Sequence, residues 1–111
     1  MVTPSVGSVI LILFPFSDLS ATKLRPALIV ASSGRDDWVC VQITSNPYAD
    51  SRAIKLDNTD FKTGSLHRSS YIRPGKLFTA NQSLFRRCVG KIKKNKLDEV
   101  RTTIISLLQG Y

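Results

Sequence analysis

Short runs of β-branched and aromatic residues recur along most of this 111-residue chain, and most of them end near Pro, Gly, Asn or Asp. The clearest run is residues 38–44, in which Val39, Val41 and Ile43 fall on one face of an extended chain. Because successive side chains of a strand point to opposite faces, this alternation predicts a strand with one apolar face. The other predicted strands are residues 9–14, 25–31, 53–56, 69–73, 76–80 and 87–92.

Residues with turn chemistry separate these runs. Turns are predicted at residues 32–37, at residues 57–60 together with Gly64, at Pro74 and Gly75, and at residues 81–83. Pro26 has no N–H to give to a sheet, so it fits only the start or the edge of its strand.

The end of the chain has a different period. Leucine, valine and isoleucine residues follow helical spacing between residues 97 and 108. Asn95 is expected to cap this helix, with Asp98 and Glu99 in its first turn, and Gly110 to stop it. The length fits a single domain over residues 1–111. We therefore expect a mainly β fold, with short antiparallel strands closed into a small barrel or sandwich and a C-terminal helix packed on it.

The charge of the chain is strongly positive and unevenly placed. Sixteen Lys and Arg residues against eight Asp and Glu give a net charge of +8, and residues 62–96 contain no acidic residue at all. Clustered basic residues of this kind indicate a polyanion as the partner. RNA or DNA is the first candidate and anionic lipid the second, while a merely soluble basic surface is the alternative.

Neither the cysteines nor the apolar runs indicate a metal, a cofactor or a membrane. Cys40 and Cys88 lack a second Cys or a His at metal-ligand spacing, and we expect both to be buried free thiols in a reducing cytoplasm. The run at residues 9–14 is too short to span a bilayer and lacks the features of a secretory leader. We therefore expect a cytoplasmic protein.

Five segments in order resemble one known family. They are residues 7–20, which read GSVILILFPFSDLS, residues 23–30, KLRPALIV, residues 41–45, VQITS, residues 70–79, SYIRPGKLFT, and residues 89–92, VGKI. Taken together they resemble the PemK/MazF-like toxins of type II toxin–antitoxin systems, over nearly the whole chain.

The resemblance implies an SH3-like barrel that forms a homodimer and cuts single-stranded mRNA at short sequences without a metal, which inhibits translation and growth. The cut leaves a 2′,3′-cyclic phosphate and a 5′-hydroxyl. It also implies a cognate antitoxin, and an acidic, partly disordered tail would suit a basic groove. The Arg of the Arg-Pro pair and the Thr of the Ile-Thr-Ser segment are the catalytic residues of such toxins, which are Arg25 and Thr44 here.

The chemistry of these two side chains agrees with that implication. Arg25 carries a planar fork of donors suited to phosphate oxygens, and Thr44 can donate one hydrogen bond to the same oxygens. If the second and third strands pair, both side chains meet on the outer, polar face. The residues predicted to bind RNA around them are Lys23, Gln42, Ser45, Asn46, Arg73 and Lys76, and Phe16 and Tyr48 are candidates for stacking on bases.

The general acid and base are left open. A guanidinium has a pKa above about 12, so Arg25 transfers a proton only if it is strongly perturbed. Histidine is the usual candidate for a base near neutral pH, but no family motif brings His67 to Arg25. Some members use an acidic residue just after the strand of Arg73, where this chain has Pro74 and Gly75.

Two other functions fit a small basic barrel. A toxin of the same fold that poisons a protein such as DNA gyrase would leave RNA intact. A non-catalytic barrel would retain RNA in a salt-dependent way without forming a cyclic phosphate.

Overall fold

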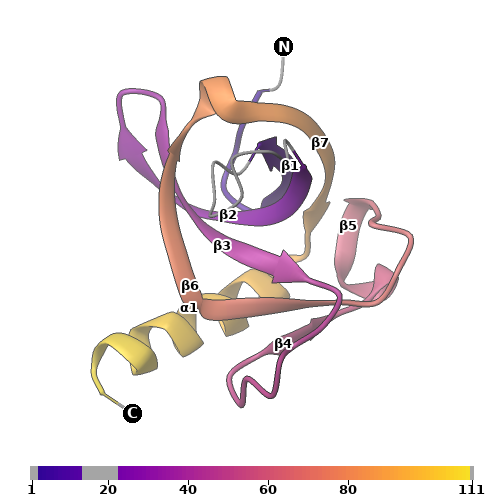
Figure 1. Cartoon of the computed structure of the whole chain (residues 1–111), viewed down its shortest axis with the longest axis vertical. Coiled ribbons are helices and arrows are strands. Elements are labelled where there is room, and N and C mark those ends of the chain that lie inside the picture. The colour runs from indigo at the N-terminus through magenta and orange to yellow at the C-terminus, as the bar shows by residue number, and fades with distance from the viewer. Residues whose placement is uncertain (1–2, 14–22, 111) are drawn as a thin grey trace.

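In the residues that the computed structural model describes, 3–13 and 23–110, seven strands form one antiparallel sheet that curls into a half-barrel (Figure 1). The sheet order is β4-β6-β3-β2-β1-β7-β5. The predicted class, mainly β with a C-terminal helix, is confirmed. The strands are β1 Ser8–Leu13, β2 Leu24–Gly34, β3 Asp37–Thr44, β4 Ile54–Leu56, β5 Phe61–Gly64, β6 Ser70–Asn81 and β7 Phe85–Ile92; the helix α1 is Lys94–Leu108.

The hairpin of β2 and β3 is longer and its turn tighter than predicted. Gly34 pairs with Asp37, which leaves only Arg35 and Asp36 in the turn, with φ values of 53° and 65°. Positive φ at both central residues is the mark of a type I′ turn, whose twist matches that of the flanking strands. The polar residues at 32–34 therefore belong to the strand, not to a loop.

The strand β6 combines two strands that the sequence predicts separately. It pairs with β3 on both sides of Pro74 and Gly75, but the register shifts between Val41, opposite Leu77, and Gln42, opposite Arg73. Pro74 is buried and cannot donate to the ladder, so the extra residues form an irregularity instead of ending the strand.

The strand β5 lies where the sequence predicts a turn, at residues 57–60 together with Gly64. Asp57 to Asp60 do form a turn with a short 3-10 helix at Asn58–Asp60, and there the backbone N–H of Asp57 donates to the Asp60 carboxylate (2.8 Å). The chain then pairs with β7, where Gly64 lies opposite Gly90. Two glycines allow the two backbones to approach closely.

The sheet carries a hydrophobic cluster on each face. One cluster packs α1 against the sheet, and it includes Leu56, Val41, Ile72, Val100 and Ile104. The second cluster contains residues of β1, β2, β3, β6 and β7, namely Ile10, Ile12, Ala27, Ile29, Cys40, Ala80 and Phe85. The strand β1 contributes to both clusters, as its continuous apolar run predicts.

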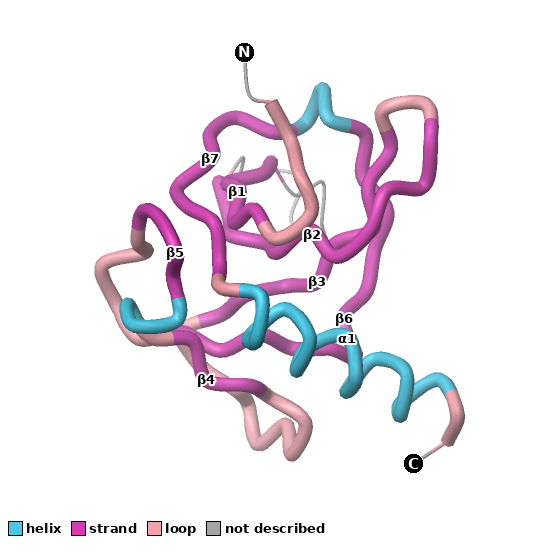
Figure 2. The backbone as a smooth tube through the Cα atoms, turned by 180° about the vertical axis from the view of Figure 1, so that it is seen from behind, coloured by secondary structure: helices cyan, strands magenta, loops and turns pink. Residues whose placement is uncertain are grey.

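The helix α1 packs across β6 (Figure 2). It begins two residues earlier than predicted: Lys93 is the N-cap, Asn95 lies inside the first turn, and no acidic residue lies there. The predicted Asn95 cap is wrong because a tertiary contact sets the start, the hydrogen bond from the Lys93 N–H to the Asp60 carbonyl (2.8 Å). The predicted stop is confirmed, since Gly110 follows the helix with a φ of +88°.

The cysteines are both free, but only Cys40 is buried. Cys88 lies exposed on β7, so its predicted burial is wrong. Among the described residues no helix is long and apolar enough to cross a membrane.

Candidate functional site

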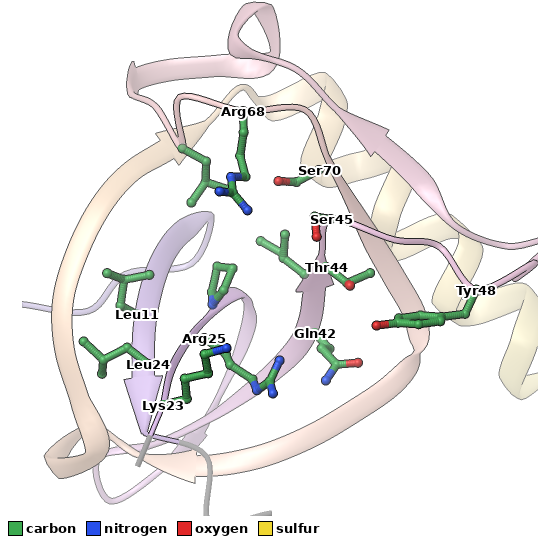
Figure 3. A pocket seen from close by; sticks show the side chains of 13 residues that line it. Leu11, Lys23, Leu24, Arg25, Gln42, Thr44, Ser45, Tyr48, Arg68 and Ser70 are labelled. Carbon is green, nitrogen blue, oxygen red and sulfur yellow. The ribbon is translucent and has the colours of Figure 1, made fainter. Parts of the chain in front are cut away.

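A pocket of about 400 Å³ opens where β2 begins and β3 ends (Figure 3). Its walls come from β1, from β2 and the residue before it, from β3 and the turn after it, and from the segment that leads into β6. The apolar part of the lining is Leu11, Leu24, Pro26, Ile43 and Leu66; the polar part is Lys23, Arg25, Gln42, Thr44, Ser45, Tyr48, Arg68 and Ser70.

The pairing of β2 with β3 brings Arg25 and Thr44 to the same pocket. Ala27 lies opposite Gln42, and continuing this register by two residues places Arg25 opposite Thr44. Directly opposite residues of an antiparallel pair project to the same face. In Figure 3 the two side chains come from neighbouring strands and border the same space.

This face differs from the outer, polar face that the sequence suggested. Ala27 and Cys40 lie on it and are fully buried in the second hydrophobic cluster. Only the ends of the strands carry polar groups there: Arg25 is exposed, and Thr44 and Gln42 are half-buried. The pair is therefore attached to the end of a packed core, which holds the backbone of both residues.

The Thr44 hydroxyl is oriented by the backbone of the next turn. The N–H of Asn46 donates to Thr44 Oγ1 (3.2 Å). A hydroxyl has one proton and two lone pairs, so this contact uses a lone pair and leaves the proton for another acceptor. The arrangement suits Thr44 as a hydrogen-bond donor into the pocket.

Three cations line the pocket. Lys23, Arg25 and Arg68 all have exposed side chains there, and its lining among the described residues includes no Asp or Glu. Converging positive charges in a concave site attract and hold a phosphodiester. The sequence alone does not single out Arg68 as a pocket residue. Its place in the acid-free stretch indicated charge, but only the loop between β5 and β6 brings it opposite β2.

The predicted RNA-binding residues divide into two groups. Lys23, Gln42 and Ser45 line the pocket, whereas Asn46, Arg73 and Lys76 are not among its lining residues. Lys76 lies exposed in the irregular part of β6. The roles of all these residues, and of Arg25 and Thr44, stay predictions.

Asn46 and Arg73 instead support the turn that follows β3. Asn46 Oδ1 accepts the N–H of Tyr48 (2.9 Å), and Arg73 Nε donates to the Asp50 carboxylate (3.0 Å). The Arg73 guanidinium also lies over the Tyr48 ring, 5.5 Å from its centroid. Tyr48 lines the pocket and is 64% exposed. Phe16, the other candidate for stacking, lies outside the described residues.

Asp50 is held in its ionised form. A hydrogen bond from the backbone N–H of Arg52 (2.9 Å) and a second one from the Arg73 side chain lower the pKa of Asp50 below its ordinary value. Both hydrogen bonds favour the charged carboxylate. Asp50 therefore keeps its hold on Arg73 at neutral pH.

His67 does not line the pocket, although its neighbours Leu66 and Arg68 do. Its backbone has a φ of 61°, and its N–H donates to Ser65 Oγ (2.8 Å). In the part of the chain that the structure describes, no three His, Cys, Asp or Glu side chains form a group that could hold a metal ion.

Solved structures that are similar to the chain include a MazF protein and endoribonuclease–antitoxin and MazE–MazF complexes. The chain is similar to MazF from Deinococcus radiodurans, with a TM-score of 0.75, 18% identity and coverage of 98% of this chain and 99% of that one. It is similar to an endoribonuclease in complex with its cognate antitoxin from a mycobacterial species, with a TM-score of 0.73, 18% identity and 98% coverage of both chains. A MazE–MazF complex from Deinococcus radiodurans matches with a TM-score of 0.76, 18% identity and 96% coverage of both.

At these identities the structural likeness establishes the fold, and it agrees with the small barrel that the resemblance implied. No curated protein matches the sequence significantly. The family model, however, matches residues 5–108. The chain therefore belongs to the PemK-like, MazF-like toxins of type II toxin–antitoxin systems.

Proposed function

We propose that this toxin is a metal-independent, sequence-specific endoribonuclease that cleaves single-stranded mRNA in the pocket where β2 begins and β3 ends, and so inhibits translation and growth. The observation that carries the proposal is that Arg25 and Thr44 line one pocket, with Lys23 and Arg68 beside them. Family membership and the endoribonuclease names of structural neighbours support it.

The proposed reaction is an intramolecular transesterification. The 2′-oxygen of the RNA forms a bond to the adjacent phosphorus, and the bond from phosphorus to the 5′-oxygen breaks. The proton of the 2′-hydroxyl is taken up, and a proton is delivered to the leaving 5′-oxygen. The products are a 2′,3′-cyclic phosphate and a 5′-hydroxyl, so the reaction consumes no water.

Six polar side chains of the pocket have a proposed part in this reaction. Arg25 stabilises the charge that builds on the equatorial phosphate oxygens, and Thr44 donates its free proton to one of them. Lys23 and Arg68 hold the flanking phosphates. Gln42 and Ser45, which line the pocket, contact base edges. Lys76 contacts the RNA backbone outside the pocket.

The test is to incubate the purified protein with a mixed RNA pool in EDTA and to sequence the fragments that carry a 5′-hydroxyl. We expect cuts at a short common sequence. Arg25→Ala should abolish the cuts with the fold retained, as judged by circular dichroism. Lys62→Ala, which removes the same charge from an exposed position of β5, is the matched control and should cut normally.

Three outcomes would contradict the proposal. Cleavage that requires added Mg²⁺ would remove the proposed chemistry. Salt-sensitive retention of RNA without any cyclic phosphate would instead favour a binding barrel. Intact and unbound RNA, together with growth arrest in cells, would favour a protein target such as DNA gyrase.

The partners are proposed on the same basis. An antitoxin with an acidic, partly disordered tail would cover the three pocket cations and compete with RNA. Coexpression with the product of the neighbouring gene should restore growth, and failure to bind it would count against the pairing.

A homodimer is proposed from the family. Exposed Ile105 and Leu108 on α1 support an apolar contact there. Light scattering should give twice the mass of one chain.

A further inference from the structure

Tyr48 is exposed, whereas the other aromatic side chains of the described residues are buried or half-buried. It is 64% exposed although it lies at the edge of a pocket, and Figure 3 shows its ring pointing toward that pocket on the side of Thr44 and Gln42. An aromatic ring of this size normally packs against a core or meets a partner.

The backbone holds Tyr48 in this place by a built turn. Tyr48 has a φ of 54° and Ala49 a φ of 58°, values that non-glycine residues rarely adopt. The turn is closed by the bond from the Tyr48 N–H to Asn46 Oδ1 and by a second one from the Asp50 N–H to the Pro47 carbonyl (2.9 Å). Strained backbone persists only where the surrounding contacts fix it.

Arg73 fixes the ring from the neighbouring strand. Its guanidinium lies 5.5 Å from the ring centroid, and its Nε is bonded to Asp50. The side chains of Arg73 and Asp50 are only 18% and 15% exposed. This ion pair is therefore much better shielded than Tyr48, and it presents a planar cation to one side of the ring.

We propose that Tyr48 is a nucleobase subsite, on which one unpaired base next to the scissile phosphate stacks, and that Asp50 and Arg73 are the residues that position it. This inference rests on the proposed ribonuclease function and adds a specificity element to it. Stacking on an aromatic ring suits single-stranded RNA, because the bases are free to turn out. Arg73 then acts through Tyr48 and not through phosphate.

The experiment measures binding of a short fluorescent RNA that contains the cut sequence, with a 2′-deoxy nucleotide at the scissile position so that it is not cleaved. Tyr48→Phe keeps the ring and should bind within about twofold of wild type. Tyr48→Leu keeps an apolar side chain without a ring and should bind roughly tenfold more weakly.

A set of RNAs with one abasic residue each then locates the contact. At a single position next to the cut, the abasic RNA should bind wild type and Tyr48→Leu equally, because the stacked base is absent from both complexes. At every other position the roughly tenfold difference should remain. A variant that was merely misfolded would show the difference at all positions.

Asp50→Asn separates positioning by Arg73 from direct contact with phosphate. If Arg73 positions the ring, loss of its anchor weakens binding, and the deficit disappears with the same abasic RNA. If Arg73 contacts phosphate, release from Asp50 strengthens binding.

Equal binding by wild type and Tyr48→Leu would overturn the inference, as would a deficit at every abasic position. If wild type cuts RNA and Tyr48→Leu binds RNA as tightly as wild type, the base subsite alone is contradicted. Wild type that neither binds nor cuts any RNA removes the ribonuclease function and the subsite together.

Discussion

Two side chains that can donate hydrogen bonds, Arg25 and Thr44, line one pocket where β2 begins and β3 ends. The guanidinium of Arg25 is exposed, and the Thr44 hydroxyl has one lone pair occupied by the Asn46 N–H (3.2 Å). Among the described residues Arg25 has no side-chain ion pair, so its N–H groups are available to a bound phosphate. Preorganised donors of this kind stabilise the transition state of phosphoryl and acyl transfer.

The role proposed for Thr44 predicts different rates for two substitutions. Thr44→Val removes the hydroxyl and should lower kcat by roughly 10²- to 10³-fold with little change in KM. Thr44→Ser keeps the donor and should retain most of the rate. Single-turnover cleavage of a defined RNA measures both. Equal rates for the Val and Ser variants would show that the methyl packing matters and the hydroxyl does not.

The two cysteines should react differently with an alkylating agent. Burial raises the pKa of the Cys40 thiol to about 12, whereas Cys88 is exposed on β7. Since the thiolate is the reactive form, iodoacetamide at neutral pH should modify Cys88 in the folded protein and Cys40 only after unfolding. Mass spectrometry of the labelled peptides distinguishes the two sites. Rapid labelling of Cys40 in the native protein would contradict the packing of the second hydrophobic cluster.

At the scale of elements, the close pairing of β5 with β7 depends on glycine. A Cβ on Gly64, where φ is +71°, would lie 2.0 Å from the Val89 carbonyl oxygen. Gly64→Ala should therefore lower the free energy of unfolding by about 1–3 kcal/mol or more, measured by urea denaturation. Gly75→Ala is the control, because nothing lies within 4 Å of its Cβ position, and it should change stability by less than about 0.5 kcal/mol. Equal stability of the two variants would show that β5 is not paired as described.

Sequence patterns identify elements here where burial follows a regular period. The alternation of β3, the continuous apolar run of β1 and the helical period of α1 all appear in the structure. The strand β5 has only four residues and one buried side chain, Phe61, so it has no period to detect. The helix start at Lys94 and the joined strand β6 also depend on partners distant in sequence, Asp60 and β3.

The two central residues of the candidate site, Arg25 and Thr44, were predicted from the family resemblance and not from a periodic pattern. The register of β2 with β3 makes Arg25 and Thr44 neighbours, and Lys23, Gln42 and Ser45 lie beside them in sequence. Arg68 enters from the loop between β5 and β6, and the Arg73–Asp50 pair forms across 23 residues. Such contacts follow from tertiary folding and leave no local pattern.

For the whole molecule, the positive charge has a measurable consequence. The chain carries +8, and three cations line the pocket. If each of Lys23, Arg25 and Arg68 neutralises one phosphate, the plot of log K against log salt should have a slope of about −2, at roughly −0.7 per contact for a single strand. Arg68→Ala should make the slope shallower by about 0.7. Binding of a non-cleavable RNA at several salt concentrations measures it, and a slope near zero would contradict a phosphate-binding pocket.

The central claim is that Arg25 and Thr44 act on one phosphodiester, and a double-mutant cycle on RNA cleavage tests it most directly. Cleavage rates are measured in EDTA for wild type, Arg25→Ala, Thr44→Val and the double variant. Because residues that act on one transition state are not additive, the loss in the double variant should be far smaller than the product of the two single losses. Two large single losses that simply multiply would mean that the two side chains act independently, and a double variant that cleaves as fast as wild type would contradict the account altogether.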